Sequence, residues 1–220
     1  MRPSTFLPAL IPLVSALPTA RSDVPQAPYT LTAYALDKPV FNGLRVNNLH
    51  LFQARVNGTC PLTSPDTPCP NGTQMAFGGV VQPITLVPGG QALYVAQDGR
   101  LTITAPHSHV LPAGALPPSV GWTWTALSAD NATATVCGDA SSADMTFYDC
   151  SAPTGVWKFA DPSAGDASGS SGGVVSCKDD DGAWALWAVR AGNASGAECV
   201  ALDGLATHTY DGPVPPVWGY

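Results

Sequence analysis

Two closely spaced histidines are the first residues of this chain whose type and spacing could support chemistry. His107 and His109 alternate by two, which places both imidazoles on one face of a strand, as in some zinc sites. The other two histidines, His50 and His208, lie in no matching motif, so no further ligand is indicated. We therefore predict no metal site and no cofactor.

A run of aspartates, Asp179-Asp180-Asp181-Gly182, resembles the middle of a calcium-binding loop. When the loop is aligned on Gly182, its first and last ligand positions fall on Cys177 and Ala188. Neither residue can supply the carboxylate that those positions need. The run is therefore predicted to be a turn.

Two patterns that could indicate hydrolysis are both incomplete. Gly169-Ser170-Ser171-Gly172-Gly173 vaguely resembles a serine-nucleophile loop, but low-complexity sequence flanks it instead of a strand and a helix. A glycosidase needs two opposed carboxylates, and the single glutamate, Glu198, abuts Cys199 with no marked partner. We predict no catalytic residues and a protein that is not an enzyme.

The tryptophans allow two interpretations. Trp122 and Trp124 alternate by two and share a face of a strand, whereas Trp184 and Trp187 lie three apart and do not. Aromatic faces stack on sugars, so a platform for polysaccharide is one interpretation. Burial in a β core is the commoner fate of tryptophan and is the interpretation that we favour.

The composition narrows the class of protein. The chain has 220 residues, enough for one domain with its own core, and 45% of them are hydrophobic. Only 11% are charged, against about 25% in an average soluble protein, and Glu198 is the only glutamate among sixteen acidic residues. Aspartate favours turns and glutamate favours helices, so this bias argues against a helical protein. The net charge of −7 disfavours nucleic-acid binding, and no basic run is present to hold an anionic membrane.

The first twenty residues are predicted to be a secretory signal peptide. Arg2 supplies the positive start, Phe6–Leu17 is an apolar run, and Val14-Ser15-Ala16 is a small-residue cleavage site, with cleavage after Ala20 as the alternative. The run is too short and too proline-rich to anchor the protein in a membrane. The rest, 21–220, is predicted to form one secreted domain with a flexible loop at 161–173 and a short, loosely packed tail after His208.

The cysteines and the glycosylation sequons are consistent with a secreted protein. Six cysteines are an even number, no Cys-x-x-Cys pair suggests zinc, and local spacing favours three disulfides. These are Cys60–Cys69, Cys137–Cys150 and Cys177–Cys199. Four Asn-x-Ser/Thr sequons predict surface glycosylation, at Asn57, Asn71, Asn131 and Asn193.

Short alternating runs bounded by glycine, proline or aspartate recur about every ten residues, and no segment keeps a helical period for three turns. The sequence therefore predicts a single compact antiparallel all-β domain, either a sandwich or a trefoil-like barrel. The clearest hairpin turn is Asp98-Gly99. Strands are expected at Tyr29–Leu36, Leu44–Phe52, Ala92–Val95, Leu101–Thr104, Trp122–Leu127, Thr133–Cys137, Met145–Tyr148, Val156–Phe159, Val174–Cys177 and Trp184–Val189.

A set of residues spread from about Tyr29 to Ala206, and strongest between Val87 and Pro112, resembles a known family. Its residues are Val87-Pro88-Gly89-Gly90-Gln91, Tyr94-Val95, Asp98-Gly99, Leu101, Thr104, His107-Ser108 and Pro112, preceded by Cys60-Pro61 and Cys69-Pro70 with the following sequon, and joined near the end by Ser176-Cys177 and Cys199. Together they resemble the fungal phialide cell-wall proteins, which are secreted IgE-binding-like proteins.

The resemblance implies a non-enzymatic secreted glycoprotein of the fungal cell wall, associated with phialide and asexual spore formation. The chain departs from the family in the additional pair Cys137 and Cys150, in the longer 161–173 loop and in the tail to Tyr220. The alternative is a carbohydrate-binding, lectin-like or weakly carbohydrate-active secreted protein. The expected partner in either case is cell-wall polysaccharide, with no nucleic acid and no membrane.

Overall fold

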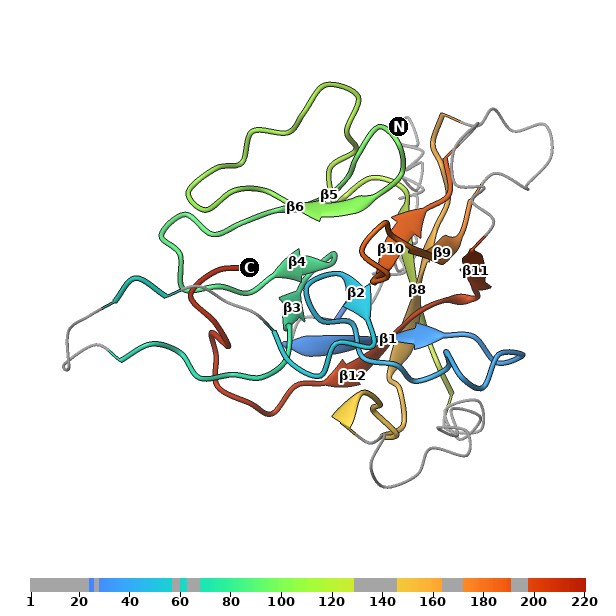
Figure 1. Cartoon of the computed structure of the whole chain (residues 1–220), viewed down its shortest axis with the longest axis horizontal. Coiled ribbons are helices and arrows are strands. Elements are labelled where there is room, and N and C mark those ends of the chain that lie inside the picture. The colour runs from blue at the N-terminus through green and yellow to red at the C-terminus, as the bar shows by residue number, and fades with distance from the viewer. Residues whose placement is uncertain are drawn as a thin grey trace, which may run out of the picture.

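The computed structural model of the chain is all-β, as the sequence predicts (Figure 1). It describes residues 24–25, 28–56, 60–62, 68–128, 146–163, 172–190 and 198–220. Within these ranges no helix is long and apolar enough to cross a membrane. The strands are β1 (Tyr29–Tyr34), β2 (His50–Leu51), β3 (Phe77–Gly78), β4 (Gln82–Pro83), β5 (Leu93–Val95), β6 (Leu101–Ile103), β7 (Trp122–Ala126), β8 (Gly155–Phe159), β9 (Val174–Lys178), β10 (Trp184–Ala188), β11 (Cys199–Leu202) and β12 (Gly204–Thr209).

The first and last strands form the centre of the largest sheet. This six-stranded sheet has the order β4-β3-β1-β12-β8-β7, and all of its pairs are antiparallel. β1 pairs with β12 over its whole length, from Tyr29 opposite Thr209 to Tyr34 opposite Gly204. Every residue of β1 is buried, because both faces of the sheet are covered at this point. The alternation of large and small side chains in β1 therefore does not indicate that one face of the strand is exposed to solvent.

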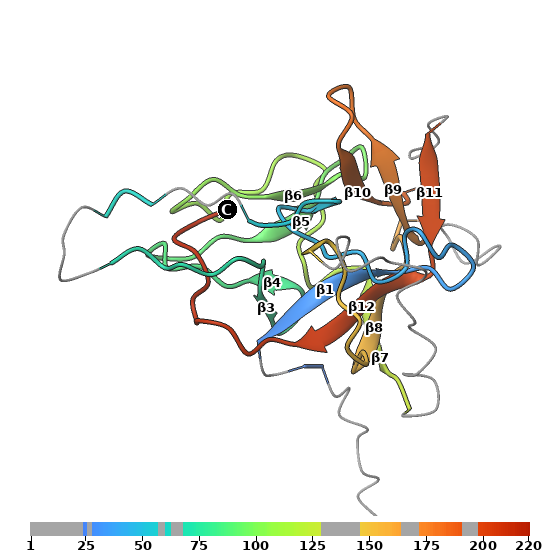
Figure 2. The same cartoon turned by 60° about the horizontal axis from the view of Figure 1, so that its bottom comes forward.

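A four-stranded sheet, β11-β9-β10-β2, stands across one end of β1 and β12, and β5 and β6 form a separate hairpin (Figure 2). Together the antiparallel sheets form a curled half-barrel. The antiparallel all-β class tied by disulfides, which the sequence predicts, is therefore present. The core lies inside the curl, and its largest fully buried side chains include Trp157, Phe77, Leu31, Leu44, Leu51, Met75, Leu93, Leu186 and Leu205.

Two of the predicted disulfides are present. Cys60–Cys69 closes a nine-residue separation, with 6.0 Å between the two Cα atoms. Cys177–Cys199 joins directly opposed residues of β9 and β11, with a Cα–Cα distance of 4.1 Å. Cys137, the predicted partner of Cys150, lies outside the described residues.

Several predicted strands differ from the structure. The segment predicted as Leu44–Phe52 contains only isolated bridges and the two-residue β2, and Tyr148 forms only an isolated bridge to Leu44. The prediction missed β3, β4, β11 and β12, although β12 is central to the largest sheet. β3, β4 and β11 are only two to four residues long, and the six-residue β12 begins with a glycine and mixes small and polar residues. The run predicted at Thr133–Cys137 lies outside the described residues.

The tail is held firmly, which corrects the expectation of loose packing. The N–H groups of Gly72, Leu86 and Val87 donate to the carbonyls of Pro216, Val217 and Trp218, at 2.8, 3.0 and 2.8 Å. The amide side chain of Gln91, which is completely buried, bonds both the N–H and the carbonyl oxygen of Tyr220. The tail therefore pairs with the 72–91 segment through backbone and side-chain hydrogen bonds.

Candidate functional site

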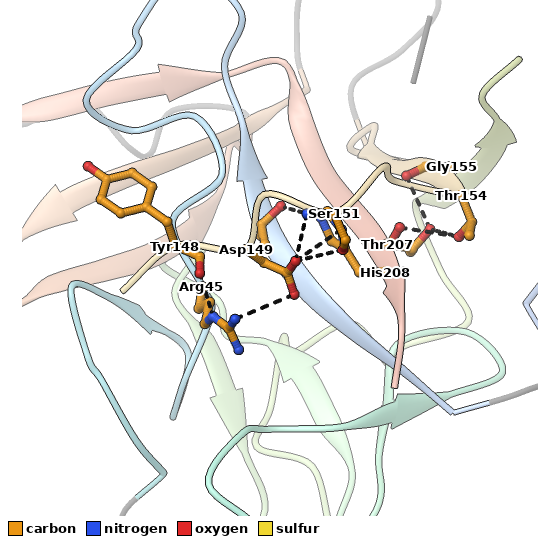
Figure 3. A network of polar contacts seen from close by, with 9 residues as sticks. Arg45, Tyr148, Asp149, Ser151, Thr154, Gly155, Thr207 and His208 are labelled. Atoms are coloured by element: carbon orange, nitrogen blue, oxygen red, sulfur yellow. Dashed lines mark hydrogen bonds and ion pairs between the residues drawn. The ribbon is translucent and has the colours of Figure 1, made fainter. Parts of the chain in front are cut away.

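Residues 146–154, which we call the strap, lie over one face of the six-stranded sheet (Figure 3). Backbone bonds hold both of its ends. Arg45 N–H donates to the carbonyl of Phe147 at 2.7 Å, and Thr154 N–H donates to the carbonyl of Thr207 at 2.7 Å. Between these points, Asp149 N–H donates to the carbonyl of Gly43 at 2.9 Å. The strap thereby brings Asp149 and Ser151 to His208 of β12.

The His208 ring is 1% exposed and is bonded at both nitrogens. Its Nε2 lies 2.9 Å from the Oγ1 of Thr32 on β1, and its Nδ1 lies 3.0 Å from the Oγ of Ser151. Ser151 Oγ in turn lies 2.6 Å from Asp149 Oδ1. Asp149 completes the network with its other oxygen, which is 3.9 Å from Arg45 Nη2 (Figure 3).

The hydroxyl protons fix the direction of this chain of bonds. A carboxylate only accepts, so the single proton of Ser151 Oγ points to Asp149. His208 Nδ1 must then donate to Ser151 Oγ, which leaves Nε2 as the acceptor of the Thr32 hydroxyl in the neutral ring. One protonation state of His208, neutral with its proton on Nδ1, thus satisfies every group.

Serine, histidine and aspartate meet here, but they are not arranged as a hydrolytic triad. A triad needs the serine on one ring nitrogen and the aspartate on the other. Ser151 and Asp149 instead both approach Nδ1 of His208, with Asp149 Oδ1 at 3.8 Å, and buried Thr32 occupies Nε2. The serine proton also points to the aspartate and not to the imidazole.

A second Asp-x-Ser turn in the chain shows that the Ser151–Asp149 contact is a local motif. The N–H and the hydroxyl of Ser163 donate to Asp161 Oδ1 at 3.0 and 2.7 Å. The N–H and the hydroxyl of Ser151 donate to Asp149 Oδ1 at 3.0 and 2.6 Å. Such turns form wherever an aspartate can bond the backbone two residues on. What is particular to the strap is the histidine placed beside the motif.

Burial and charge shift both titrating groups of the network. Burial has the largest influence on His208 and lowers the pKa of its imidazole; Arg45 adds to this, while Asp149 opposes it. Burial alone would raise the pKa of the Asp149 carboxyl, but the bonds from Ser151, the positive charge that His208 takes up in acid and the Arg45 guanidinium bring it below its ordinary value. Near neutral pH the site therefore holds a neutral imidazole beside an ionised carboxylate.

A second polar cluster lies at a cavity beside the four-stranded sheet. The cavity has a volume of about 370 Å³ and is lined by Asn48, Leu49, His50, Tyr220 and the segment 100–103. Asp179, next to it, lies 2.5 Å from Arg100 Nη2 and 3.6 Å from His50 Nε2. Its carboxylate therefore positions both side chains.

Arg100 is held from a second side. Its guanidinium lies 5.8 Å from the centre of the Trp187 ring, a cation–π distance. A guanidinium held between a carboxylate and an aromatic ring is preorganised at the cavity wall.

The turn that carries His50 is strained. Asn47 and His50 exchange backbone bonds at 3.1 and 3.0 Å, so Asn48 and Leu49 form a two-residue hairpin turn with φ of 50° and 62°. Such a turn favours glycine at its second position, where this chain has leucine. A left-handed non-glycine residue costs about 1–2 kcal/mol, and burial of Leu49 in the core offsets it. Phe52 is also left-handed, with φ of 58°.

Phe52 belongs to a group of three rings that we call the aromatic surface: Phe41, Phe52 and Trp184. The Phe41 ring centre lies 5.0 Å from that of Trp184 and 5.7 Å from that of Phe52, both edge to face. Phe52 is 37% exposed, and the other two rings are partly exposed. A shallow apolar depression of about 380 Å³ runs from Phe41 along Val40 to Val200 of β11.

Trp122 and Trp124 do not form an exposed platform for polysaccharide. Trp122 is buried against Phe159, with ring centres 5.3 Å apart. Trp124 packs over Gly155 and donates from Nε1 to Thr207 Oγ1 at 3.3 Å. These two rings are structural, whereas Trp184, which does not share a side with Trp187, contributes to the aromatic surface.

The other candidate residues lie in turns. His107 Nδ1 is 3.1 Å from the carbonyl of Pro88, and His109 Nε2 is 2.5 Å from that of Gly89, so both exposed rings are used to bond a neighbouring loop. The aspartate run is the turn between β9 and β10, in which Gly182 N–H donates to the carbonyl of Asp179 at 2.9 Å. Among the residues that the structure describes, no group of three His, Cys, Asp or Glu could hold a metal ion.

Asn71 is the one predicted glycosylation site that falls within the described residues, and it is exposed. The following Gly72 packs so closely on Pro216 that a Cβ there would lie 2.6 Å from the proline carbonyl oxygen. The other predicted features lie outside the described residues: the signal peptide 1–20, Asn57, Asn131, Asn193, the serines of 169–171 and most of the 161–173 loop.

In the comparisons with known proteins, no family model, no curated protein and no solved structure matches the chain.

Proposed function

We propose that the protein is a secreted cell-wall glycoprotein that binds wall polysaccharide without turning it over. The resemblance to phialide cell-wall proteins supports the location, and two disulfides and an exposed sequon at Asn71 are compatible with it. Disulfides persist in oxidising, extracellular compartments. A role in phialide and asexual spore formation follows from the resemblance alone and is part of the proposal.

The aromatic surface is the observation that carries polysaccharide binding. Its three rings come from separate segments, and left-handed Phe52 lies outermost at 37% exposure. A large ring held at a strained backbone position without full burial gains little for folding, and such strain clusters at binding sites. The C–H faces of pyranose rings pack against aromatic faces, so polysaccharide is the ligand class that matches.

Polar side chains beside the rings can bond sugar hydroxyls. Gln53 follows Phe52 directly, and its Oε1 accepts from Asn48 Nδ2 at 3.3 Å, while Asn47 Nδ2 donates to the Gln53 carbonyl at 2.8 Å. Amide side chains both donate and accept, which suits the hydroxyl groups of a sugar. The bonds among them reduce the entropy that would be lost on binding.

The alternative, a carbohydrate-active enzyme, has less support from the geometry. Its best nucleophile, Ser151, gives its proton to Asp149 instead of to His208, and the ring nitrogen that would serve a triad is occupied by Thr32. The lectin-like form of the alternative is the one that the aromatic surface supports.

Retention on insoluble polysaccharide tests the proposal. Purified glycosylated protein is mixed with chitin or β-1,3-glucan particles, and the bound fraction is measured for the wild type, for Phe52→Asn and for Val110→Asn. Asparagine tolerates the left-handed backbone at position 52, so the fold is kept while the ring is lost. Val110 is 82% exposed and lies away from the aromatic surface in sequence, which makes its change the matched control.

We expect retention of the wild type and of Val110→Asn on at least one polysaccharide, and at least a fivefold weaker apparent affinity for Phe52→Asn, about 1 kcal/mol. Lack of retention of the wild type, or equal retention of all three, would contradict polysaccharide binding through this surface.

A further inference from the structure

The strap is fastened to the sheet by polar contacts as well as by the packing of Phe147 and Tyr148 against the core, and one of the polar contacts depends on a titratable group. Its backbone bonds to Arg45, Gly43 and Thr207 are supplemented by the bond from Tyr148 Oη to the carbonyl of Val40, at 2.8 Å. Beneath the middle of the strap, Ser151 contacts the buried ring of His208. The proposed function uses none of these groups.

The bonds around His208 admit the neutral ring and oppose the charged one. A second proton on Nε2 would face the hydroxyl proton of Thr32 across 2.9 Å, and Thr32 is itself completely buried. The Thr32 hydroxyl would have to turn and give up its role as a donor. The added charge would also lie in a side chain that is 1% exposed, where desolvation disfavours it.

We propose that the strap is an acid-labile latch: protonation of His208 releases residues 146–154 from the six-stranded sheet while the sheet itself stays paired. Ser151 is exposed and lies directly on the Nδ1 side of the ring, so opening of the strap hydrates the imidazole. The open form therefore binds the proton more tightly than the closed form does. Acid shifts the population toward the open form by this difference in affinity.

Two charged groups face the ring, and they act in opposite directions. Asp149 of the strap, 3.8 Å from Nδ1, favours the charged imidazole, whereas Arg45 opposes it. Burial adds to the effect of Arg45, and the net pKa of His208 lies below its ordinary 6.5. With one proton taken up on opening, the open population rises by up to about tenfold per pH unit as the pH falls from 6.5 to the lowered pKa.

Amide hydrogen exchange of the intact protein measures this release directly. Protection factors, corrected for the intrinsic pH dependence of exchange, are compared at pH 7.5 and 5.0 for the amides of Asp149 and Thr154 and for those of the β1–β12 ladder. We expect protection of the two strap amides to fall at least threefold and that of the ladder to stay constant. Constant protection of the strap, or an equal loss in the ladder, would overturn the proposal.

Two variants separate the latch from general acid sensitivity. His208→Asn keeps a donor near the Nδ1 position and cannot titrate, so its strap protection should not change with pH. His107→Asn removes an exposed histidine and should behave as the wild type does. If pH dependence persists in His208→Asn, the proposal is wrong.

Asp149→Asn tests the proposal in case the His208→Asn variant does not fold. The amide oxygen still accepts from Ser151, but the charge that favours the imidazolium is gone, so the pKa of His208 falls further. The loss of strap protection between pH 6.5 and 4.5 should then exceed that of the wild type. An equal or smaller loss would contradict the assignment to His208.

Discussion

Gly155 offers a sharp test of how β7 and β8 are packed. A Cβ built on this residue overlaps the Trp124 indole and lies 2.5 Å from its Nε1. The ring would have to turn away and lose its bond to Thr207, worth about 1 kcal/mol. Forced repacking of a buried strand position adds about 1–2 kcal/mol. We therefore expect Gly155→Ala to destabilise the protein by about 2–3 kcal/mol.

Gly78→Ala is the matched control, because Gly78 also lies in a strand with an ordinary φ. Its Cβ would meet Ile84 Cδ1 at 3.6 Å, an ordinary contact. Replacing glycine by alanine where the backbone allows it stabilises by about 0.4–1 kcal/mol through the unfolded state. The two changes are thus expected to have opposite signs.

Urea unfolding and thermal unfolding, both followed by tryptophan fluorescence, measure both variants. A loss of about 2–3 kcal/mol in a domain of this size lowers Tm by about 4–12 °C. In a Trp124→Leu background, Gly155→Ala should cost much less, because the ring that it displaces is absent; this coupling isolates the contact. Equal stability of the two alanine variants would refute the placement of Trp124 over β8.

Three further predictions follow from the same structure. Peptide mapping should link Cys60 to Cys69 and Cys177 to Cys199, and the paired change Cys177→Ser with Cys199→Ser should lower stability by about 3 kcal/mol in urea. Arg100→Met should cost about 1–3 kcal/mol by removing the guanidinium that contacts mostly buried Asp179, and adding Asp179→Asn should recover part of that loss. Because the pKa of His208 lies below 6.5 and that of Asp149 below 3.8, stability should decline as pH falls below 6.5 and again below 3.8; constant stability from pH 7.5 to 3 in calorimetry would contradict both shifts.

Local patterns predicted those parts of the fold that neighbouring residues determine. Asp98-Gly99 does connect β5 and β6, with Gly99 at φ of 97°, because this turn requires a left-handed residue. The two disulfides within the described ranges join cysteines that are near in sequence, where loop closure costs least. The all-β class followed in the same way from frequent turn residues and the lack of a helical period.

Contacts between segments that are distant in the sequence could not be predicted from local sequence patterns. β12 contains one glycine and one alanine, Gly204 and Ala206, beside polar Thr207 and His208, and only its full pairing with β1 makes it a strand. The network at His208 draws Thr32 from 176 positions away, and no spacing rule links the two. Phe41 and Phe52 carried no signal in the sequence, because their proximity to Trp184 depends on how β2 joins β10.

The strap and the aromatic surface are physically connected, which gives the two proposals a common consequence. Tyr148 of the strap bonds the carbonyl of Val40, and Val40 directly precedes Phe41 of the aromatic surface. Release of the strap removes this bond and the one from Asp149 to Gly43, so the loop that carries Phe41 loses contacts on both sides of that ring. A ring that must be ordered again on binding costs affinity. Polysaccharide retention should therefore weaken in acid through His208, and the His208→Asn variant should retain its affinity from neutral pH to pH 5.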